Sequence, residues 1–571
     1  MDAHPRASWP RPVPLIGDRS RAAERAADPS GWAFDESTIA ALHEVIEARR
    51  DIRRYRADPV PPEVLRRVLA AGHAAPSVGH SQPWRFVVVT EQATRDRAAV
   101  LADRERLRQA ELLTPDRRAR LLDLQLDGIR EAPVGVVVAC DRRTPATGVL
   151  GRATFPDTDL WSCACAIQNI WLAARAAGLG MGWVTLFQPA DLAALLYLPD
   201  GVETLGWLCL GWPDERPPEP GLERHGWSRR LALDDVVLAE RWPDDGDPAA
   251  PVSHLAGPGQ AAVVAARDTG DELLAAPESL GVLDRAVNRV LALTGPEPRT
   301  GTLVVIGADH PVAAHRISAY PASVTDDVLA ASRAGESLGA ATARRAGLAV
   351  KVRRAEPVDA PGDLLTADAM TPAAVAALVD QGRALGDELA GRGLVCLGEV
   401  GIGNTTVAAA LAAALLGLGA DQAVGLGSGA DAAMLERKRT VVAGALVRAQ
   451  AEHGPALAEP LTALAALGGA ELAMLTGVTL GAAAAGVPVV LDGLATSLAA
   501  LVAVRLEPAV QAALVAGHRS RERAHGTVLT ELGLEPLLDL RLRAGEGVGA
   551  CLAAQLLLTA LAVRRTAGRT S

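Results

Sequence analysis

The chain has 571 residues, of which 49% are hydrophobic and 22% charged, and its net charge is −10. Single hydrophobic cores rarely grow beyond roughly 250 to 300 residues, so this length predicts at least two domains. The acidic balance argues against a nucleic-acid-binding protein, which would need a basic face, and we expect no polyanionic partner.

The first 36 residues, taken as an N-terminal extension, contain no apolar run of the kind found in secretory signals. The most apolar later stretch, residues 478–504, is interrupted by Gly486, Pro488 and Asp492. This pattern favours a buried strand between helices over a membrane span. We therefore expect a cytoplasmic protein without membrane contact.

The first predicted domain covers residues 37–242. It combines helical patterns, as at residues 61–75, with apolar strand-like runs at residues 85–90, 134–140 and 206–212. Residues 243–260 are rich in Pro, Gly and Asp without periodicity, which predicts a linker.

The second predicted domain covers residues 261–571. Its strand-like runs are separated by long Ala- and Leu-rich helical segments, and they lie at residues 303–309, 348–354, 394–399 and 487–493. This alternation is typical of a parallel Rossmann-like sheet, so we expect an α/β fold. Asp309, Glu399 and Asp492 end three of these strands. They should converge at the carboxyl edge of the sheet, unless each one only caps the helix that follows.

An arginine-rich segment, RRDIRRY, occupies residues 49–55. Its guanidinium groups could bind a phosphate or a planar electron-rich heterocycle, or they could form a solvated basic helix end. A second segment, APSVGHSQPWRF, places Ser77 and Gln82 beside Gly79 and Pro83. That composition favours backbone packed against a flat ligand.

These two segments, with LGRATFPDTDLWSCACAIQNIWLAARAAGLGMGWVTLF and HGWSRRLAL, resemble the nitroreductase-like flavoproteins and, among them, the 5,6-dimethylbenzimidazole synthase (BluB) family. The resemblance covers residues 37–242 and implies an α+β flavin domain. It also implies FMN-binding residues, namely Arg49, Arg50, Arg53, Ser77, Gly79, Gln82, Gly182 and Arg230. The family consumes reduced FMN with O₂, so FMN would be a co-substrate. Asp51 matches an acid typical of the synthases, and Thr185 stands where the family has a catalytic Ser.

The segment GEVGIGNTT, residues 398–406, follows an apolar run and precedes a helix-like stretch. Gly401 and Gly403 would let the backbone approach a ligand, while Asn404 and Thr405 could cap the helix. Consecutive N–H groups at a helix start favour an anion. Because the lysine of a nucleoside-triphosphatase loop is absent, the segment indicates a monophosphate site, or else a merely tight turn.

This loop belongs to a longer series of motifs, which includes GADHPVAAHRISAYPASVTDDV, LGGAELAMLTG and LRAGEGVGA. The series resembles the nicotinate-nucleotide:dimethylbenzimidazole phosphoribosyltransferase (CobT) family across residues 275–565. The resemblance implies that Glu546 is the general base and Glu399 an electrostatic support. It further implies that Lys438, otherwise readable as a solvated lysine, holds the phosphate with the glycine loop. Asp309, Ser318 and Tyr320 would border the base pocket.

Several residues depart from the family pattern. Asp327 stands where the family has Gln, and Ala470, Val400 and Val548 stand where it has Phe, Met and Thr. These changes could widen the base pocket. The six cysteines lie mostly in apolar runs, so we expect core thiols and no metal site.

The two resemblances together imply a bifunctional enzyme that builds the lower ligand of cobalamin, because the product of the first activity is the acceptor of the second. We expect reduced FMN, O₂ and nicotinate mononucleotide as substrates, a homodimer, and a flavin reductase that supplies reduced FMN. Two alternatives are an NAD(P)H-dependent flavin reductase or nitroreductase fused to the transferase, and a first domain that binds flavin without catalysis.

Overall fold

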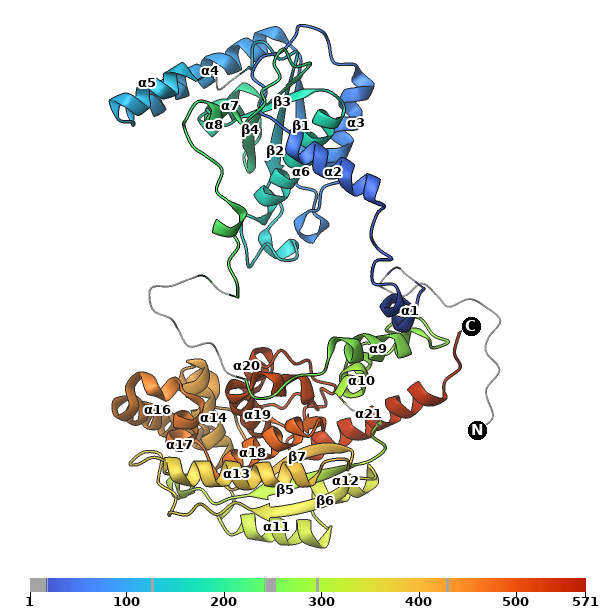
Figure 1. Cartoon of the computed structure of the whole chain (residues 1–571). Coiled ribbons are helices and arrows are strands. Elements are labelled where there is room, and N and C mark those ends of the chain that lie inside the picture. Colours follow the sequence, from blue (N-terminus) through green and yellow to red (C-terminus); the bar gives the residue numbers. More distant parts are fainter. Residues whose placement is uncertain are drawn as a thin grey trace. The chain divides into compact units, whose positions relative to one another are not determined.

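The computed structural model describes residues 17, 19–124, 128–240, 242, 253–293, 297–427 and 431–570. Its internal contacts divide the chain into an N-terminal unit of residues 32–248 and a C-terminal unit of residues 1–31 and 249–571 (Figure 1). Parts of two predicted segments lie outside the described residues: 1–16 and 18 of the extension, and 243–252 of the linker.

The N-terminal unit is built on a four-stranded antiparallel sheet of order β1-β2-β4-β3. The strands are β1 (Trp84–Val89), β2 (Val134–Asp141), β3 (Gly180–Val184) and β4 (Val202–Gly211). Alternate residues of β2 enter two different cores. Val136 and Val138 pack with α6, while Val137 packs with α4 and α7. Helices therefore cover both faces of the sheet, as expected for strands with near-continuous apolar runs.

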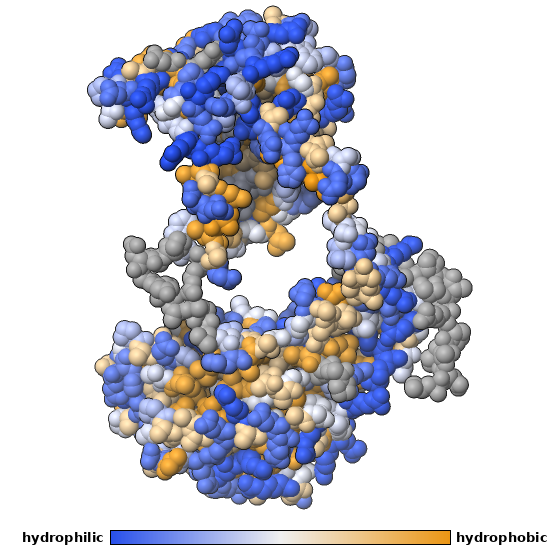
Figure 2. Space-filling view, viewed as in Figure 1, coloured by the Kyte–Doolittle hydropathy of each residue, from blue (hydrophilic) through white to orange (hydrophobic). Residues whose placement is uncertain are grey.

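The helices of this unit begin with α2, whose N-cap Asp35 accepts the N–H of Thr38. They are α2 (Glu36–Ala48), α3 (Pro62–His73), α4 (Gln92–Glu111), α5 (Pro115–Asp123), α6 (Thr158–Ala176), α7 (Pro189–Leu195) and α8 (Gly221–Arg224), with 3₁₀ turns η1 (Val78–His80), η2 (Ala146–Gly148) and η3 (Leu233–Asp235). In Figure 2 the surface around α4 and α5 is mostly hydrophilic. The segment around η3 exposes the apolar side chains of Leu231, Leu233 and Val237.

The C-terminal unit contains a five-stranded parallel sheet of order β6-β5-β7-β8-β9. The strands are β5 (Gly301–Gly307), β6 (Ala349–Arg354), β7 (Leu394–Val400), β8 (Val489–Leu491) and β9 (Leu514–Ala516). The predicted parallel sheet is thus confirmed, with one strand more than the four predicted. β9 was missed because it follows the Ala-rich turn η6 directly, and no change in composition separates the two.

Helices cover both faces of this sheet (Figure 1). They are α9 (Gln260–Asp271), α10 (Val282–Leu293), α11 (Val324–Ala334), α12 (Leu338–Arg345), α13 (Pro372–Glu388), α14 (Asn404–Leu416), α15 (Ala420–Ala423), α16 (Ala432–His453), α17 (Pro460–Leu467), α18 (Ala470–Ala484), α19 (Leu494–Leu506), α20 (His525–Glu531) and α21 (Val548–Thr566), with η4 (Pro311–His315), η5 (Gly454–Ala458) and η6 (Pro508–Ala513). Val304 and Leu397 face the core formed with α13, α14, α18 and α19, while Leu303 and Cys396 face α10 and α21.

Among the described residues, one helix has the length and composition to cross a membrane. This helix is α21, and 56% of its apolar window is buried inside the protein. It packs against β7 and β8, which accounts for its apolar composition as a core helix.

The N-terminal extension contributes a short helix, α1 (Ala22–Ala27), to the C-terminal unit. Arg25 Nη2 lies 2.8 Å from Asp268 Oδ1 of α9, and Arg21 Nε lies 3.4 Å from Glu272 Oε1. No local sequence pattern predicts this placement, because the contact joins segments more than 240 positions apart.

The described end of the predicted linker is also bound to the C-terminal unit. The backbone N–H groups of His254 and Leu255 and the hydroxyl of Ser253 all donate to the carboxylate of Glu507, at 2.8 to 3.3 Å. His254 Nδ1 lies 2.8 Å from the same carboxylate. These residues therefore belong to the folded unit and not to a free linker.

We expect a fragment of residues 253–571 to be more stable than one of residues 262–571. The shorter fragment loses these hydrogen bonds to Glu507, and a hydrogen bond to a charged group contributes about 1.5 to 3 kcal/mol. Thermal unfolding of both fragments measures the difference. Because these contacts hold the pKa of Glu507 below its ordinary value, the advantage should be full at neutral pH and shrink as the pH falls through the carboxylate range. Equal stability at neutral pH would contradict this prediction.

Candidate active sites

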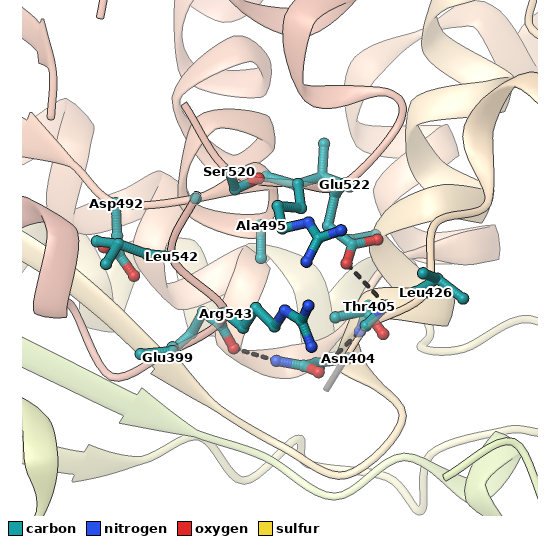
Figure 3. A pocket seen from close by; sticks show the side chains of 17 residues that line it. Glu399, Asn404, Thr405, Leu426, Asp492, Ala495, Ser520, Glu522, Leu542 and Arg543 are labelled. Atoms are coloured by element: carbon teal, nitrogen blue, oxygen red, sulfur yellow. Dashed lines mark hydrogen bonds between the residues drawn. The ribbon is translucent and has the colours of Figure 1, made fainter. Parts of the chain in front are cut away.

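Two of the three strand-end acids share one cavity at the carboxyl edge of the parallel sheet. Glu399 at the end of β7 and Asp492 after β8 both line a cavity of about 200 Å³, together with Asn404, Thr405 and Arg543 (Figure 3). The third acid, Asp309, instead forms an ion pair with Arg354 and lines a separate small cavity. The predicted convergence therefore holds for Glu399 and Asp492, and Asp309 is not brought to the same place.

A second cavity of about 150 Å³ adjoins the first, because Glu399, Asn404, Thr405 and Gly545 line both. It brings together most of the residues predicted for the transferase site, namely Ser318, Tyr320, Glu399, Gly401, Gly403, Asn404, Thr405, Lys438 and Glu546. Val400 also lines it. Asp327 is exposed on α11 and is not among the lining residues, so the structure does not place its charge in the cavity.

The glycines of the loop before α14 are required by geometry. Gly403 has φ +101°, which favours glycine, and forms the N-cap of α14. A Cβ on Gly401 would lie 2.8 Å from both Ala308 O and His310 Nε2. The loop therefore packs closely against Ala308 and His310. It leaves the N-terminus of α14 open to the cavity, where backbone N–H groups favour an anion.

Lys438 of α16 reaches this loop. Its side chain is almost fully buried, and Nζ donates to Thr405 Oγ1 at 3.2 Å. Burial lowers the pKa of Lys438, and the charge of Glu522 partly offsets that effect. A solvated surface lysine is therefore excluded, and the amino group supplies a cation beside the glycine loop.

Glu546 is held in a strained conformation between two segments. Its φ of 63° is left-handed, a conformation that costs a non-glycine residue about 1 to 3 kcal/mol and is frequent at functional sites. Its Oε2 accepts the N–H of Gly339 at the start of α12 at 3.0 Å, and its own N–H donates to Glu399 O at 3.2 Å. A Cβ on Gly339 would lie 2.3 Å from Glu546 O, so this position needs glycine.

Glu399 is the most strongly perturbed acid of the site. Burial raises its pKa to about 8, and the nearby charges of Glu471 and Asp492 act in the same direction. Asn404 Nδ2 donates to its carboxyl group (Figure 3). In the ligand-free site Glu399 is therefore mostly protonated at neutral pH, and a cation bound beside it would favour loss of that proton.

Three further polar residues of the site were not predicted from the sequence. Arg543 lines the first cavity and points into it (Figure 3), while His310 and Glu471 lie buried behind the glycine loop. The only available signals were the motifs GADHP and LGGAE, in which a buried His or Glu cannot be told from a surface one by spacing alone.

In the N-terminal unit, Asp51 lies between two arginines. Arg53 Nη2 is 3.0 Å and Arg49 Nη1 3.9 Å from its carboxylate. Arg49 also stacks over Trp171, 4.5 Å from the ring centroid. A Cβ on Gly182 would lie 2.5 Å from Ile52 O, so this glycine lets β3 approach the arginine segment. The structure thus brings Arg49, Asp51, Arg53 and Gly182 together.

The other predicted flavin residues lie in separate segments. Ser77 Oγ accepts the N–H of Gln82 at 3.1 Å around a turn in which Gly79 has φ +52°. Thr185 is exposed directly after β3. Arg50 Nη2 donates to Pro218 O at 2.9 Å, and Arg230 lies after α8, where its backbone N–H donates to Glu223.

All six cysteines are free thiols, and five of them are buried. A hydrogen bond with Cys140, together with burial, raises the pKa of Cys163, while Cys165 is exposed. Within the described residues, Asp368, Glu452 and His453 place ligand atoms close enough for a metal ion. Arg448 pairs with both of these acids, at 2.8 and 2.5 Å.

Comparison with known proteins identifies both units. Residues 255–570 match the family model described as Phosphoribosyltransferase, and residues 46–212 match that of the Nitroreductase family. The 5,6-dimethylbenzimidazole synthase of Rhodospirillum rubrum is 42% identical over 203 residues, which cover 35% of this chain and 95% of the relative. The chain belongs to the phosphoribosyltransferase family and, through its N-terminal unit, to the 5,6-dimethylbenzimidazole synthases.

Relatives of the phosphoribosyltransferase unit carry a consistent name. The nicotinate-nucleotide–dimethylbenzimidazole phosphoribosyltransferase of Mesorhizobium japonicum is 43% identical over 258 residues, covering 45% of this chain and 75% of the relative. The solved structure of CobT from Thermus thermophilus is 38% identical, covering 53% of this chain and 96% of that one, with a TM-score of 0.49.

Proposed function

We propose that the chain is a bifunctional enzyme that makes the lower ligand of cobalamin. Its N-terminal unit fragments reduced FMN with O₂ to 5,6-dimethylbenzimidazole. Its C-terminal unit then transfers the phosphoribosyl group of nicotinate mononucleotide to that base. The observation that carries the proposal is the meeting of Glu546, Glu399, Lys438 and the glycine loop on two adjoining cavities, in a chain whose relatives are named for these two reactions.

In the proposed transfer, the nucleotide phosphate binds the N–H groups at the start of α14 and the amino group of Lys438. A ring nitrogen of dimethylbenzimidazole forms a bond to the anomeric carbon. The bond from that carbon to nicotinate breaks, and its electron pair stays on the pyridine nitrogen. Glu546 accepts the benzimidazole proton, which yields α-ribazole phosphate and nicotinate. Glu399 faces the ribose and stabilises positive charge that develops there.

In the proposed fragmentation, the arginine segment binds the flavin. The Nε of Arg50 is buried without a hydrogen-bond partner in the part of the chain that the structure describes, so it offers a donor to a ligand. Arg49 and Arg53 supply charge that suits a phosphate and an electron-rich ring. Reduced FMN supplies the reactivity toward O₂. Asp51, held between the two arginines, moves a proton, and the Thr185 hydroxyl at the end of β3 assists as a hydrogen-bond donor.

Fusion of the two activities has a physical rationale. The product of the N-terminal unit is the acceptor of the C-terminal unit, and a covalent connection raises its effective concentration near the second site. A homodimer and a flavin reductase that supplies reduced FMN stay predictions from the resemblance.

One reaction mixture tests the proposal. The full chain is given ¹³C-labelled reduced FMN, O₂ and nicotinate mononucleotide, and the products are identified by mass. We expect labelled dimethylbenzimidazole and labelled α-ribazole phosphate. Recovery of intact FMN without dimethylbenzimidazole would favour the flavin reductase or the non-catalytic flavin-binding alternative. A parallel reaction with added unlabelled dimethylbenzimidazole isolates the transfer step.

A further inference from the structure

A buried histidine and glutamate lie together behind the glycine loop of the transferase site. His310 follows β5 and Glu471 lies in the first turn of α18, and their side chains are 4% and 0% exposed. His310 Nε2 is 3.3 Å from Glu471 Oε1, without the geometry of a hydrogen bond, and both carboxylate oxygens of Glu471 lack a hydrogen-bond partner among the described residues.

Two glycines make room for this pair. A Cβ on Gly469 would lie 2.5 Å from Glu471 Oε2 and 2.7 Å from His310 Cε1. A Cβ on Gly401, in the glycine loop itself, would lie 2.8 Å from His310 Nε2. The pair is therefore enclosed between the loop before α14 and the start of α18, in direct contact with the segment that borders both cavities.

A buried pair of this geometry contributes little to the stability of the fold. Removing two charges from water costs several kcal/mol per ion, and only excellent geometry with further hydrogen bonds recovers that cost. Here the mutual geometry is imperfect and the remaining lone pairs of Glu471 are unsatisfied. Buried charge of this kind is more frequent at functional sites than elsewhere.

Glu399 stands two residues before Gly401, the glycine that lies against His310, and it lines both cavities. After burial, the charge of Glu471 is the largest influence that raises the pKa of Glu399, while His310 acts in the opposite direction with a smaller effect. Burial lowers the pKa of His310, yet the charges of Glu471, Glu399 and Asp309 outweigh it and raise that pKa. The three side chains therefore form one interacting set.

We propose that His310 and Glu471 are positioning residues that set the charge Glu399 presents to the ribosyl group of a bound nucleotide. This inference rests on the proposed function, because it assumes that a cationic nicotinate nucleotide binds beside Glu399. Burial, with the added charge of Glu471, keeps the carboxyl group of Glu399 neutral in the empty site, and the positive charge of the nucleotide drives the proton off. The resulting carboxylate then faces the anomeric carbon.

Other groups also face Glu399. Asp492 after β8 acts with Glu471, Asn404 of α14 donates to the carboxyl group, and Glu546 and Arg543 line the adjoining walls from the segment before α21. Arg521 and Glu522 line the first cavity as well, and Lys438 lines the second. All of these residues are retained in a variant of His310 or Glu471, so a shift in such a variant is assigned to the pair.

The test is the pH profile of kcat/KM for nicotinate mononucleotide at saturating dimethylbenzimidazole, measured on the full chain. In the wild type we expect kcat/KM to rise with pH along a limb centred near pH 8, as Glu399 ionises. Glu471→Gln removes the negative charge and should move this limb down by about one pH unit. His310→Gln removes the opposing positive charge and should move it up or leave it unchanged. The double variant should move it down, because Glu471 has the larger effect.

Asp284→Asn is the matched control. Asp284 forms a buried ion pair with Arg564 at 3.0 Å, on α10 and α21, and lines neither cavity. It should lose thermal stability and keep the wild-type profile. The inference is overturned if Glu471→Gln and the double variant keep the wild-type limb, or if both single variants move it in the same direction. If Glu471→Gln does not fold, the double variant, in which no unpaired charge remains, decides. Absence of α-ribazole phosphate from the wild type itself would instead refute the proposed function.

Discussion

Glu546→Gln should lower the rate of phosphoribosyl transfer by about 10² to 10⁴, which is what a positioned general base contributes. The amide keeps the size of the side chain and can still accept the N–H of Gly339, so the left-handed backbone at this position should persist. Only proton acceptance is lost. Single-turnover reactions with dimethylbenzimidazole and nicotinate mononucleotide measure the rate, and nucleotide affinity should barely change.

Lys438→Met provides the opposite pattern. The thioether fills the buried space of the lysine stem without its charge, so affinity for the nucleotide should fall while the rate at saturating nucleotide is largely kept. If Glu546→Gln lost nucleotide affinity and kept its chemistry, the base role would pass to another acid. Glu399 would then be the candidate, because Asp327 does not line the cavity.

Asp51→Asn should still bind FMN but release dimethylbenzimidazole at a rate lower by about 10² to 10⁴, because the variant cannot move a proton. A carboxylate beside an electron-rich ring contributes little to holding it, and the amide oxygen can still accept from Arg53, which lies 3.0 Å from Asp51. Flavin binding is followed by absorbance, and dimethylbenzimidazole by chromatography after addition of reduced FMN and O₂.

Asp58→Asn is the control for this experiment. Asp58 pairs with Arg56 at 2.9 Å, and its side chain is 50% exposed, close to the 43% of Asp51. The two substitutions therefore break similar arginine pairs, and only the one at Asp51 should affect product release. A normal yield of dimethylbenzimidazole from Asp51→Asn would remove this residue from the proposed mechanism.

The sequence predicted the sheets well because buried strands leave long apolar runs. β1, β2 and β4 to β8 were visible in this way. β3 contains two glycines among its five residues, and β9 follows the Ala-rich η6 without a change in composition. The parallel direction of the strands in the C-terminal sheet then followed from the alternation of strands and helices. That alternation also explains why the strand pattern alone was enough to place Glu399 and Asp492 at one edge of the sheet.

Side-chain positions were harder to predict wherever they depend on contacts between distant segments. Lys438 lies in a charged stretch typical of a helix surface, and its burial arises from packing of α16 on the glycine loop. Asp309 follows a strand of the same sheet, yet it pairs with Arg354 of the neighbouring strand and lines a different cavity. Such outcomes depend on which partner a side chain meets, and spacing along one segment does not encode the partner.

The placement of α1 makes the N-terminal unit an insertion within another fold. The segment before the N-terminal unit and the segment after it both belong to the C-terminal unit, so the chain passes between the two units twice. After a cut before α2, the halves would stay joined by the intact chain that follows the N-terminal unit. After a cut beyond residue 242, the contacts of α1 with α9 would be the remaining link, and they are not covalent.

The same placement fixes an order of events during synthesis. The contact between Arg25 and Asp268 spans 243 positions. At about 5 to 20 residues per second, α1 leaves the ribosome roughly 12 to 50 seconds before its partner helix exists. The contact between α1 and α9 can therefore form only after residue 268 has been synthesised, when the whole sequence of the N-terminal unit is already present.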